Sequence, residues 1–111
     1  MKILVVDDSW VDLEIFDYLL KDYPNIEALY ARDKREAIEV LEDNPDIKKV
    51  LTDYALVNED GVDVLHAVKN INIDLPVYLT SQRKVEDPVV DGFSGFMNKD
   101  ELKDWLKEIN K

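Results

Sequence analysis

Short apolar runs alternate with amphipathic segments along this chain, and the alternation limits its possible folds more than any other feature. Each run has the length of a strand, and the first, Ile-Leu-Val-Val, is followed directly by two carboxylates. The runs predict strands at residues 3–6, 26–31, 47–52, 76–80 and 93–97. Strands that alternate with helices predict an α/β fold, with a mostly parallel sheet and helices on both faces.

The segments between the runs have the spacing of helices that bury one face. Predicted helices cover residues 9–22, 33–41, a stretch that starts at Asp60-Gly61, and 102–109. In the first helix the predicted apolar stripe consists of Val11, Ile15, Tyr18 and Leu19. At the start of the second, Asp33 and Glu36 have the spacing of a capping box. Residues 81–91 are poorly patterned, and Pro88 interrupts any long helix there.

Composition limits what such a protein can bind. The 111 residues suit one domain, 1–111, and 46% of them are hydrophobic, which is enough for a core. The net charge of −11 argues against direct binding to nucleic acid, whose phosphates attract Lys and Arg patches. There is no cysteine, and the N-terminal apolar run of four residues is too short for a signal peptide or a membrane span. We therefore expect a soluble, cytoplasmic protein with no membrane partner.

Ligands of a parallel α/β sheet bind at the carboxyl ends of its strands. The polar residues predicted at those ends are Asp7, Asp8, Asp53, Thr80 and Lys99. Carboxylates held close together near a core repel one another and need a cation. We therefore predict a site for a hard divalent ion, Mg²⁺ or Mn²⁺, at Asp7, Asp8 and Asp53. The alternative is that Asp7 or Asp8 only caps the first helix and that Asp53 is an ordinary strand-end residue.

A hydroxyl and an ammonium follow the last two predicted strands. Thr80 and Lys99 could bind the oxygens of a phosphoryl group carried by a carboxylate, because phosphoryl transfer needs mainly positioning and charge neutralisation. Otherwise Thr80 is a β-branched strand residue and Lys99 forms an ion pair without chemistry. Other reactions fit less well, since the three glycines form no phosphate-binding loop and the single His66 lies between apolar neighbours in a helical stretch.

Taken in order, the strand-end polar residues resemble the receiver domain of bacterial two-component response regulators, the CheY-like fold. Gly61 follows Asp53 at that family's usual interval, and Phe96 stands three residues before Lys99. The resemblance spans nearly the whole chain. It implies a flavodoxin-like sheet of five parallel strands in the order 2-1-3-4-5.

The resemblance also implies a chemical role for each acid. Asp53 would accept a phosphoryl group from a phosphohistidine on a sensor histidine kinase or a histidine phosphotransfer protein. Asp8, Asp53 and the backbone carbonyl of Ala55 would bind the metal, and Asp7 would act partly through water. Such a domain is a signalling module and not an enzyme, since it catalyses at most its own phosphorylation and dephosphorylation.

The remaining residues would transmit the change, again by resemblance. Thr80 and Lys99 would contact the phosphoryl oxygens. Thr80 would move toward the phosphate and Phe96 would turn inward with it. That movement would alter the surface to which an unknown downstream protein binds.

The chain departs from the family pattern at three places. Val57 stands where the family often has proline, and Asp100 replaces the proline that usually follows the lysine. A trans bond is expected before Asp100, because a non-proline cis bond costs about 2.5–4 kcal/mol. The segment between Thr80 and Lys99 is shorter than usual by about one helical turn. We therefore expect a short or irregular fourth helix, and a monomer that does not dimerise through this face.

Three functions remain open from the sequence. The first is a stand-alone phosphoacceptor that signals through a protein partner. The second is a non-phosphorylated pseudo-receiver that acts only as an interaction module. The third is a phosphatase like the haloacid dehalogenases, but those carry a second Asp two residues after the first, where this chain has Ser9 after Asp7.

Overall fold

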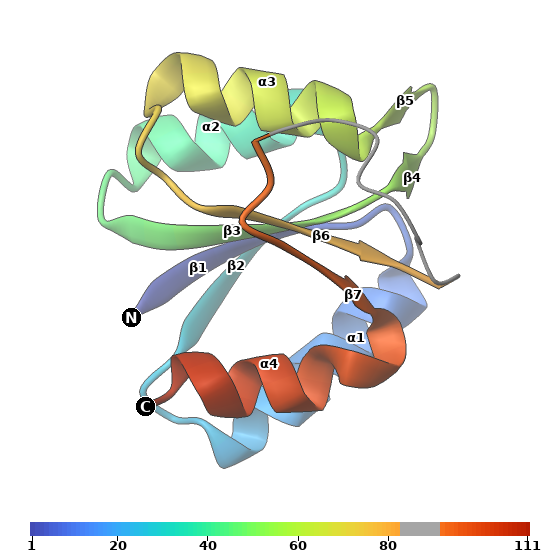
Figure 1. Ribbon diagram of the computed structural model, residues 1–111, viewed down its shortest axis with the longest axis vertical. Helices are drawn as coiled ribbons and strands as arrows, with labels where there is room; N and C mark the ends of the chain where they lie inside the picture. The colour runs from blue at the N-terminus through green and yellow to red at the C-terminus, as the bar shows by residue number, and fades with distance from the viewer. Residues whose placement is uncertain (83–91) are drawn as a thin grey trace.

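A sheet of five parallel strands forms the centre of the computed structural model, which describes residues 1–82 and 92–111 (Figure 1). The strands are β1 (Lys2–Val6), β2 (Glu27–Ala31), β3 (Ile47–Asp53), β6 (Val77–Ser81) and β7 (Gly95–Asn98). Their order in the sheet is β2-β1-β3-β6-β7, which confirms the expected 2-1-3-4-5 arrangement. Because β1 and β3 are neighbours, the residues that follow them lie side by side at one edge.

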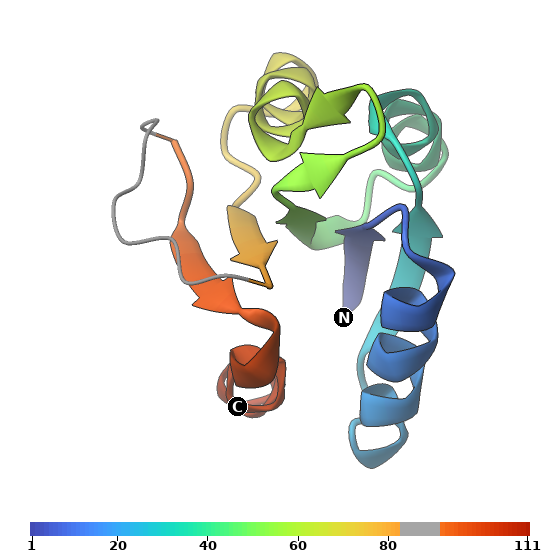
Figure 2. The same ribbon diagram turned by 90° about the vertical axis from the view of Figure 1, so that its right-hand side faces the viewer.

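Helices cover both faces of the sheet, as the alternation of elements predicts (Figures 1 and 2). They are α1 (Trp10–Leu19), α2 (Lys34–Asp43), α3 (Gly61–Ile71) and α4 (Leu102–Ile109). Helices α2 and α3 pack on one face, and α1 and α4 pack on the other. The 3₁₀ turn η1 (Leu20–Asp22) follows α1, and the 3₁₀ turn η2 (Lys99–Glu101) precedes α4. No helix within the described ranges has the length and apolar character needed to cross a membrane.

The sheet divides the hydrophobic core into two layers, because successive residues of a strand point to opposite faces. Leu4 and Val6 of β1 pack with α2 and α3, whereas Ile3 and Val5 pack with α1 and α4. None of the four is more than 5% exposed, as expected of a central parallel strand. By the same period of two, Asp7 falls on the face that α1 and α4 cover.

The buried face of α1 differs from the predicted stripe. Val11, Ile15 and Tyr18 are 64, 51 and 67% exposed, and Leu13 and Phe16 are buried instead. Of the predicted stripe only Leu19 packs against the core. The prediction was wrong for the other three because α1 carries apolar residues on more than one face, so their spacing alone does not decide which face meets the sheet. The residue at which α1 starts after β1 determines which face of the helix meets the sheet.

The segment after β3 contains a hairpin that the sequence did not predict. Strands β4 (Ala55–Leu56) and β5 (Glu59–Asp60) pair antiparallel, and Asn58 in the turn between them has a positive φ of 64°. Asn tolerates this left-handed conformation better than most residues. Val57, at the position where the family often has proline, lies in the same turn and is exposed.

Carboxylates cap two of the helices. Asp60 caps α3 within a complete capping box, so the predicted helix start at Asp60-Gly61 is confirmed. Asp33 caps α2 through its side chain, which accepts the Glu36 N–H at 2.8 Å. The Glu36 carboxylate accepts the Arg32 N–H and so does not close the predicted box with Asp33.

Two further expectations concern the chain between β6 and α4. The short or irregular fourth helix predicted around Pro88 lies outside the described residues. The bond between Lys99 and Asp100 is trans, as expected where proline is absent.

Candidate functional site

Three carboxylates meet at the carboxyl edge of the sheet. Asp7 and Asp8 follow β1, and Asp53 is the last residue of the neighbouring strand β3. One oxygen from each of the three lies within 4.8 Å of the others, close enough to share a metal ion. Asp7 and Asp53 are only 4% and 8% exposed, so neither is an ordinary surface acid.

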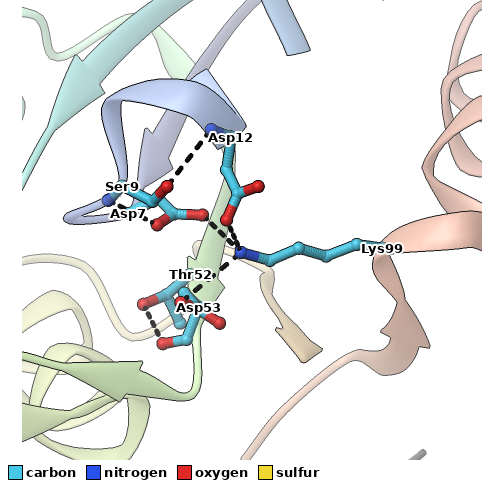
Figure 3. Close-up of polar contacts among 6 residues, drawn as sticks. All are labelled: Asp7, Ser9, Asp12, Thr52, Asp53 and Lys99. Carbon is cyan, nitrogen blue, oxygen red and sulfur yellow. Dashed lines mark hydrogen bonds and ion pairs between the residues drawn. The ribbon is translucent and has the colours of Figure 1, made fainter. Parts of the chain in front are cut away.

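A lysine side chain reaches these carboxylates from the β7 side of the sheet (Figure 3). Lys99 follows β7, and its Nζ lies 2.8 Å from Asp7 Oδ2, 2.5 Å from Asp12 Oδ2 and 3.6 Å from Asp53 Oδ2. The backbone just before it is held by Glu101, whose carboxylate accepts the Asn98 N–H at 3.1 Å. This contact orients the chain at Lys99 although the usual proline is absent.

The start of α1 orients Asp7. Ser9 is the N-cap of the helix, and its hydroxyl accepts the Asp12 N–H at 3.3 Å. The Ser9 N–H in turn donates to Asp7 Oδ1 at 2.9 Å. The alternative in which Asp7 or Asp8 caps this helix is therefore wrong, and both carboxylates remain available to the site.

Burial and mutual repulsion shift the acids away from their ordinary ionisation. Burial, helped by the charge of Asp7, raises the pKa of Asp53 to about 6, although Lys99 acts to lower it. Burial also raises the pKa of Asp7. Burial would lower the pKa of Lys99, but hydrogen bonds to Asp12 and Asp7 raise it to about 12. One ammonium does not compensate the carboxylates around it, and an all-oxygen donor set of this kind suits a hard divalent cation.

Thr80 lies beside Asp53 on the neighbouring strand β6. It is paired with Asp53 in the β3–β6 register, and its carbonyl accepts the Tyr54 N–H at 2.9 Å. Its side-chain oxygen is buried and has no hydrogen-bond partner among the described residues. Thr52 contrasts with it, since that hydroxyl donates to the Asp53 carbonyl at 3.0 Å.

Ala55 and Phe96 are the other two residues that the sequence assigned to the site. Ala55 begins β4, two residues after Asp53, and is exposed. Phe96 is half-buried in β7, where its ring packs edge-on against Phe93 with centroids 5.4 Å apart. Neither position tests the role expected for the residue. Metal binding by the Ala55 carbonyl and the inward turn of Phe96 therefore stay predictions.

Sequence reasoning missed two contributors, Ser9 and Asp12. A signal for Asp12 was present, because it falls in the first turn of the helix that starts directly after Asp7-Asp8 and so lies close to the same edge. The register of α1 was needed to use it, and that register was not fixed by the apolar pattern. Which acid pairs with Lys99 most closely became evident only from the folded chain.

The sheet order and this acidic edge with its lysine define a CheY-like α/β domain. The chain belongs to the response regulator receiver domain family, whose model matches residues 3–109. Receiver domains are signalling domains that interact with histidine kinases or phosphotransfer proteins and bind Mg²⁺ at an acidic cluster. Asp7, Asp8 and Asp53 form such a cluster in this chain.

Individual relatives are distant in sequence and close in fold. The two-component response regulator ORR13 of Oryza sativa subsp. japonica is 26% identical over 95 residues, which cover 84% of this chain and 78% of that protein. A response regulator receiver domain protein of Clostridium thermocellum is 22% identical with a TM-score of 0.80, covering 96% of this chain and 91% of that one. The response regulator domain of Thermotoga maritima CheB is 18% identical with a TM-score of 0.81, covering 99% and 92%.

Proposed function

We propose that this receiver domain accepts a phosphoryl group on Asp53 from a phosphohistidine of a sensor kinase or phosphotransfer protein. The supporting observation is the juxtaposition of a buried carboxylate, Asp53, with two further carboxylates on one side and the Lys99 ammonium on another. In the step itself an Asp53 oxygen forms a bond to phosphorus while the phosphorus–nitrogen bond of the phosphohistidine breaks. The electron pair of that bond stays on the imidazole nitrogen.

Asp7, Asp8 and Asp53 would hold Mg²⁺, or Mn²⁺ in its place, together with the backbone carbonyl of Ala55. The ion would neutralise charge on the phosphoryl oxygens during transfer. The fit rests on the oxygen-only donor set, with its atoms within 4.8 Å of one another. The pKa of Asp53 is raised mainly by burial and further by the charge of Asp7, a repulsion that a bound cation would offset.

Two side chains of the sheet edge would bind the phosphoryl group itself. Lys99 is 3.6 Å from Asp53 Oδ2 and would neutralise a phosphoryl oxygen. Thr80 has a buried hydroxyl without a partner in the described residues, and a phosphoryl oxygen beside it would supply one. Phe96 would turn inward as Thr80 moves and so pass the change to the surface.

We further propose that residues 1–111 act as one receiver domain whose output passes through a protein partner. The acid cluster and lysine favour this phosphoacceptor over a pseudo-receiver that works without phosphorylation. A haloacid-dehalogenase-like phosphatase fits less well, because Ser9 stands where its second Asp would be and caps α1 here.

One experiment distinguishes these functions. The purified protein is incubated with acetyl phosphate and Mg²⁺, and its intact mass is followed beside the Asp53→Asn variant. We expect a transient phosphoryl adduct in the wild type, none in the variant, and none in the wild type when Mg²⁺ is chelated. A wild type that never forms the adduct would identify a pseudo-receiver, and steady hydrolysis of phosphate monoesters would identify a phosphatase.

A further inference from the structure

Asp12 is a fourth carboxylate at this site. It forms an ion pair with Lys99 and is not one of the three carboxylates that could share a metal ion. Its Oδ2 lies 2.5 Å from Lys99 Nζ, whereas the group able to hold a metal consists of Asp7, Asp8 and Asp53. Figure 3 shows Asp12 reaching from α1 to the ammonium on the side away from Asp53. The two carboxylates therefore approach the same ammonium from different directions.

The distances show which carboxylate binds Lys99 more closely. Lys99 Nζ donates hydrogen bonds to Asp12 Oδ2 at 2.5 Å and to Asp7 Oδ2 at 2.8 Å, whereas Asp53 Oδ2, at 3.6 Å, lies beyond hydrogen-bond length. The side chains of Lys99 and Asp12 are 15% and 17% exposed, which limits screening of the pair by water. Lys99, Asp12 and Thr80 also line a cavity of about 170 Å³, which leaves the ammonium space to move.

We propose that Asp12 is a positioning residue that holds the Lys99 ammonium on the α1 side of the site, in competition with a phosphoryl group on Asp53. The competition, though not the resting contact, rests on the proposed phosphoacceptor function. Asp12 thereby lowers the affinity of the site for the phosphoryl group. When that group is present, its oxygens draw the ammonium away from Asp12 and toward Asp53.

The direction of the effect follows from the charges. Asp12→Asn keeps the size of the side chain but removes the charge that attracts Lys99. The ammonium then binds a phosphoryl oxygen after giving up one ion pair fewer, because among the described residues only the Asp7 carboxylate, 2.8 Å away, still competes for it. We expect the affinity for a phosphoryl mimic to rise by about twofold to fivefold, the range for one partly exposed ion pair.

Titration with beryllofluoride in the presence of Mg²⁺, followed by ¹⁹F NMR, measures this affinity in the intact protein. The matched control is Glu14→Gln, which removes one negative charge from an exposed position of the same helix. The control is expected to bind beryllofluoride like the wild type, so that a general change in charge is excluded. Asp12→Glu restores the carboxylate and should return the affinity toward the wild-type value.

Side-chain NMR of Lys99 tests the resting contact without any phosphoryl mimic. We expect the Nζ resonance to shift in Asp12→Asn and to stay in place in Glu14→Gln. An unshifted resonance, or an affinity for beryllofluoride that is equal or weaker in Asp12→Asn, overturns the proposal. If the wild type itself does not bind beryllofluoride, the phosphoacceptor function fails and the competition fails with it, while the resonance still decides the resting contact.

Discussion

At the scale of single residues, two buried threonines beside Asp53 have opposite hydrogen-bonding states. The Thr80 hydroxyl has no partner in the described chain, while the Thr52 hydroxyl donates to the Asp53 carbonyl. A buried hydroxyl without a partner costs free energy, and one that is paired contributes about 1 kcal/mol. Under the proposed function, a phosphoryl oxygen on Asp53 would supply the missing partner of the Thr80 hydroxyl and offset that cost.

Thr80→Val should therefore stabilise the unphosphorylated protein, because it replaces the unpaired hydroxyl with a methyl group of similar shape. We expect the free energy of unfolding in urea to rise by about 1 kcal/mol and the affinity for beryllofluoride to fall. Thr52→Val is the matched control and should lose about 1 kcal/mol of stability. A loss of stability of the same size in both variants would show that the Thr80 hydroxyl is not unpaired in solution.

The raised pKa of Asp53 predicts a pH-dependent stability in the metal-free protein. Its pKa is about 6 in the folded protein, above the ordinary value of 3.8, so folding favours the protonated carboxyl. The stabilising contribution is present at low pH and is lost as the pH rises through 6. At pH 7.5 Asp53→Asn should accordingly be more stable than the wild type by about 2 kcal/mol.

That difference should shrink by about 1 kcal/mol when the pH is lowered from 7.5 to 5, since the wild-type carboxyl becomes protonated. Urea unfolding of both proteins in the presence of a chelator measures it. Acids such as Glu36, whose pKa is lowered by Arg32, titrate in both proteins and cancel in the comparison. A difference that stays constant between the two pH values would contradict the raised pKa.

At the scale of secondary-structure elements, α3 starts very close to the backbone of Asp53. A Cβ on Gly61, the first residue of α3, would lie 2.8 Å from the Asp53 carbonyl oxygen and 2.7 Å from Leu79 Cδ1. The first is a backbone atom inside the sheet, so it cannot move aside cheaply. Glycine is needed here for close approach and not for an unusual φ.

Gly61→Ala should consequently destabilise the protein by about 2 kcal/mol or more, because it forces α3 away from β3. Urea unfolding measures the loss, and the beryllofluoride affinity reports whether Asp53 is displaced as well. Gly95→Ala is a graded control, since its Cβ would meet only the Tyr78 ring at 3.1 Å. Equal effects of the two substitutions would show that α3 can shift without strain.

The same elements show what the sequence could predict. Runs such as Ile3–Val6 are buried on both sides, so their apolar character alone identifies a central strand and places the acids that follow it. Asp60-Gly61 marked the start of α3 because the capping chemistry is local. The register of α1 and the Asp12–Lys99 pair depend on contacts between distant parts of the chain, and no local pattern encodes them.

At the scale of the whole molecule, the net charge of −11 makes two kinds of stabilisation by salt possible. Any salt screens the repulsion among the surface acids. A divalent ion bound at Asp7, Asp8 and Asp53 would add stability that depends on its own concentration. The two contributions separate when the ionic strength is held constant.

Mg²⁺ should raise the free energy of unfolding by about 2.7 kcal/mol at a hundredfold excess over its dissociation constant, compared with NaCl of equal ionic strength. Asp8→Asn should lose this specific gain because it removes a carboxylate of the cluster, and it should keep the response to NaCl. Asp74→Asn, which removes one exposed acid away from the cluster, is the control for charge alone. Thermal or urea unfolding in both salts measures all three proteins. Equal stabilisation by the two salts in the wild type would mean that the cluster binds no metal, because the effect of Mg²⁺ would then be screening of the acidic surface.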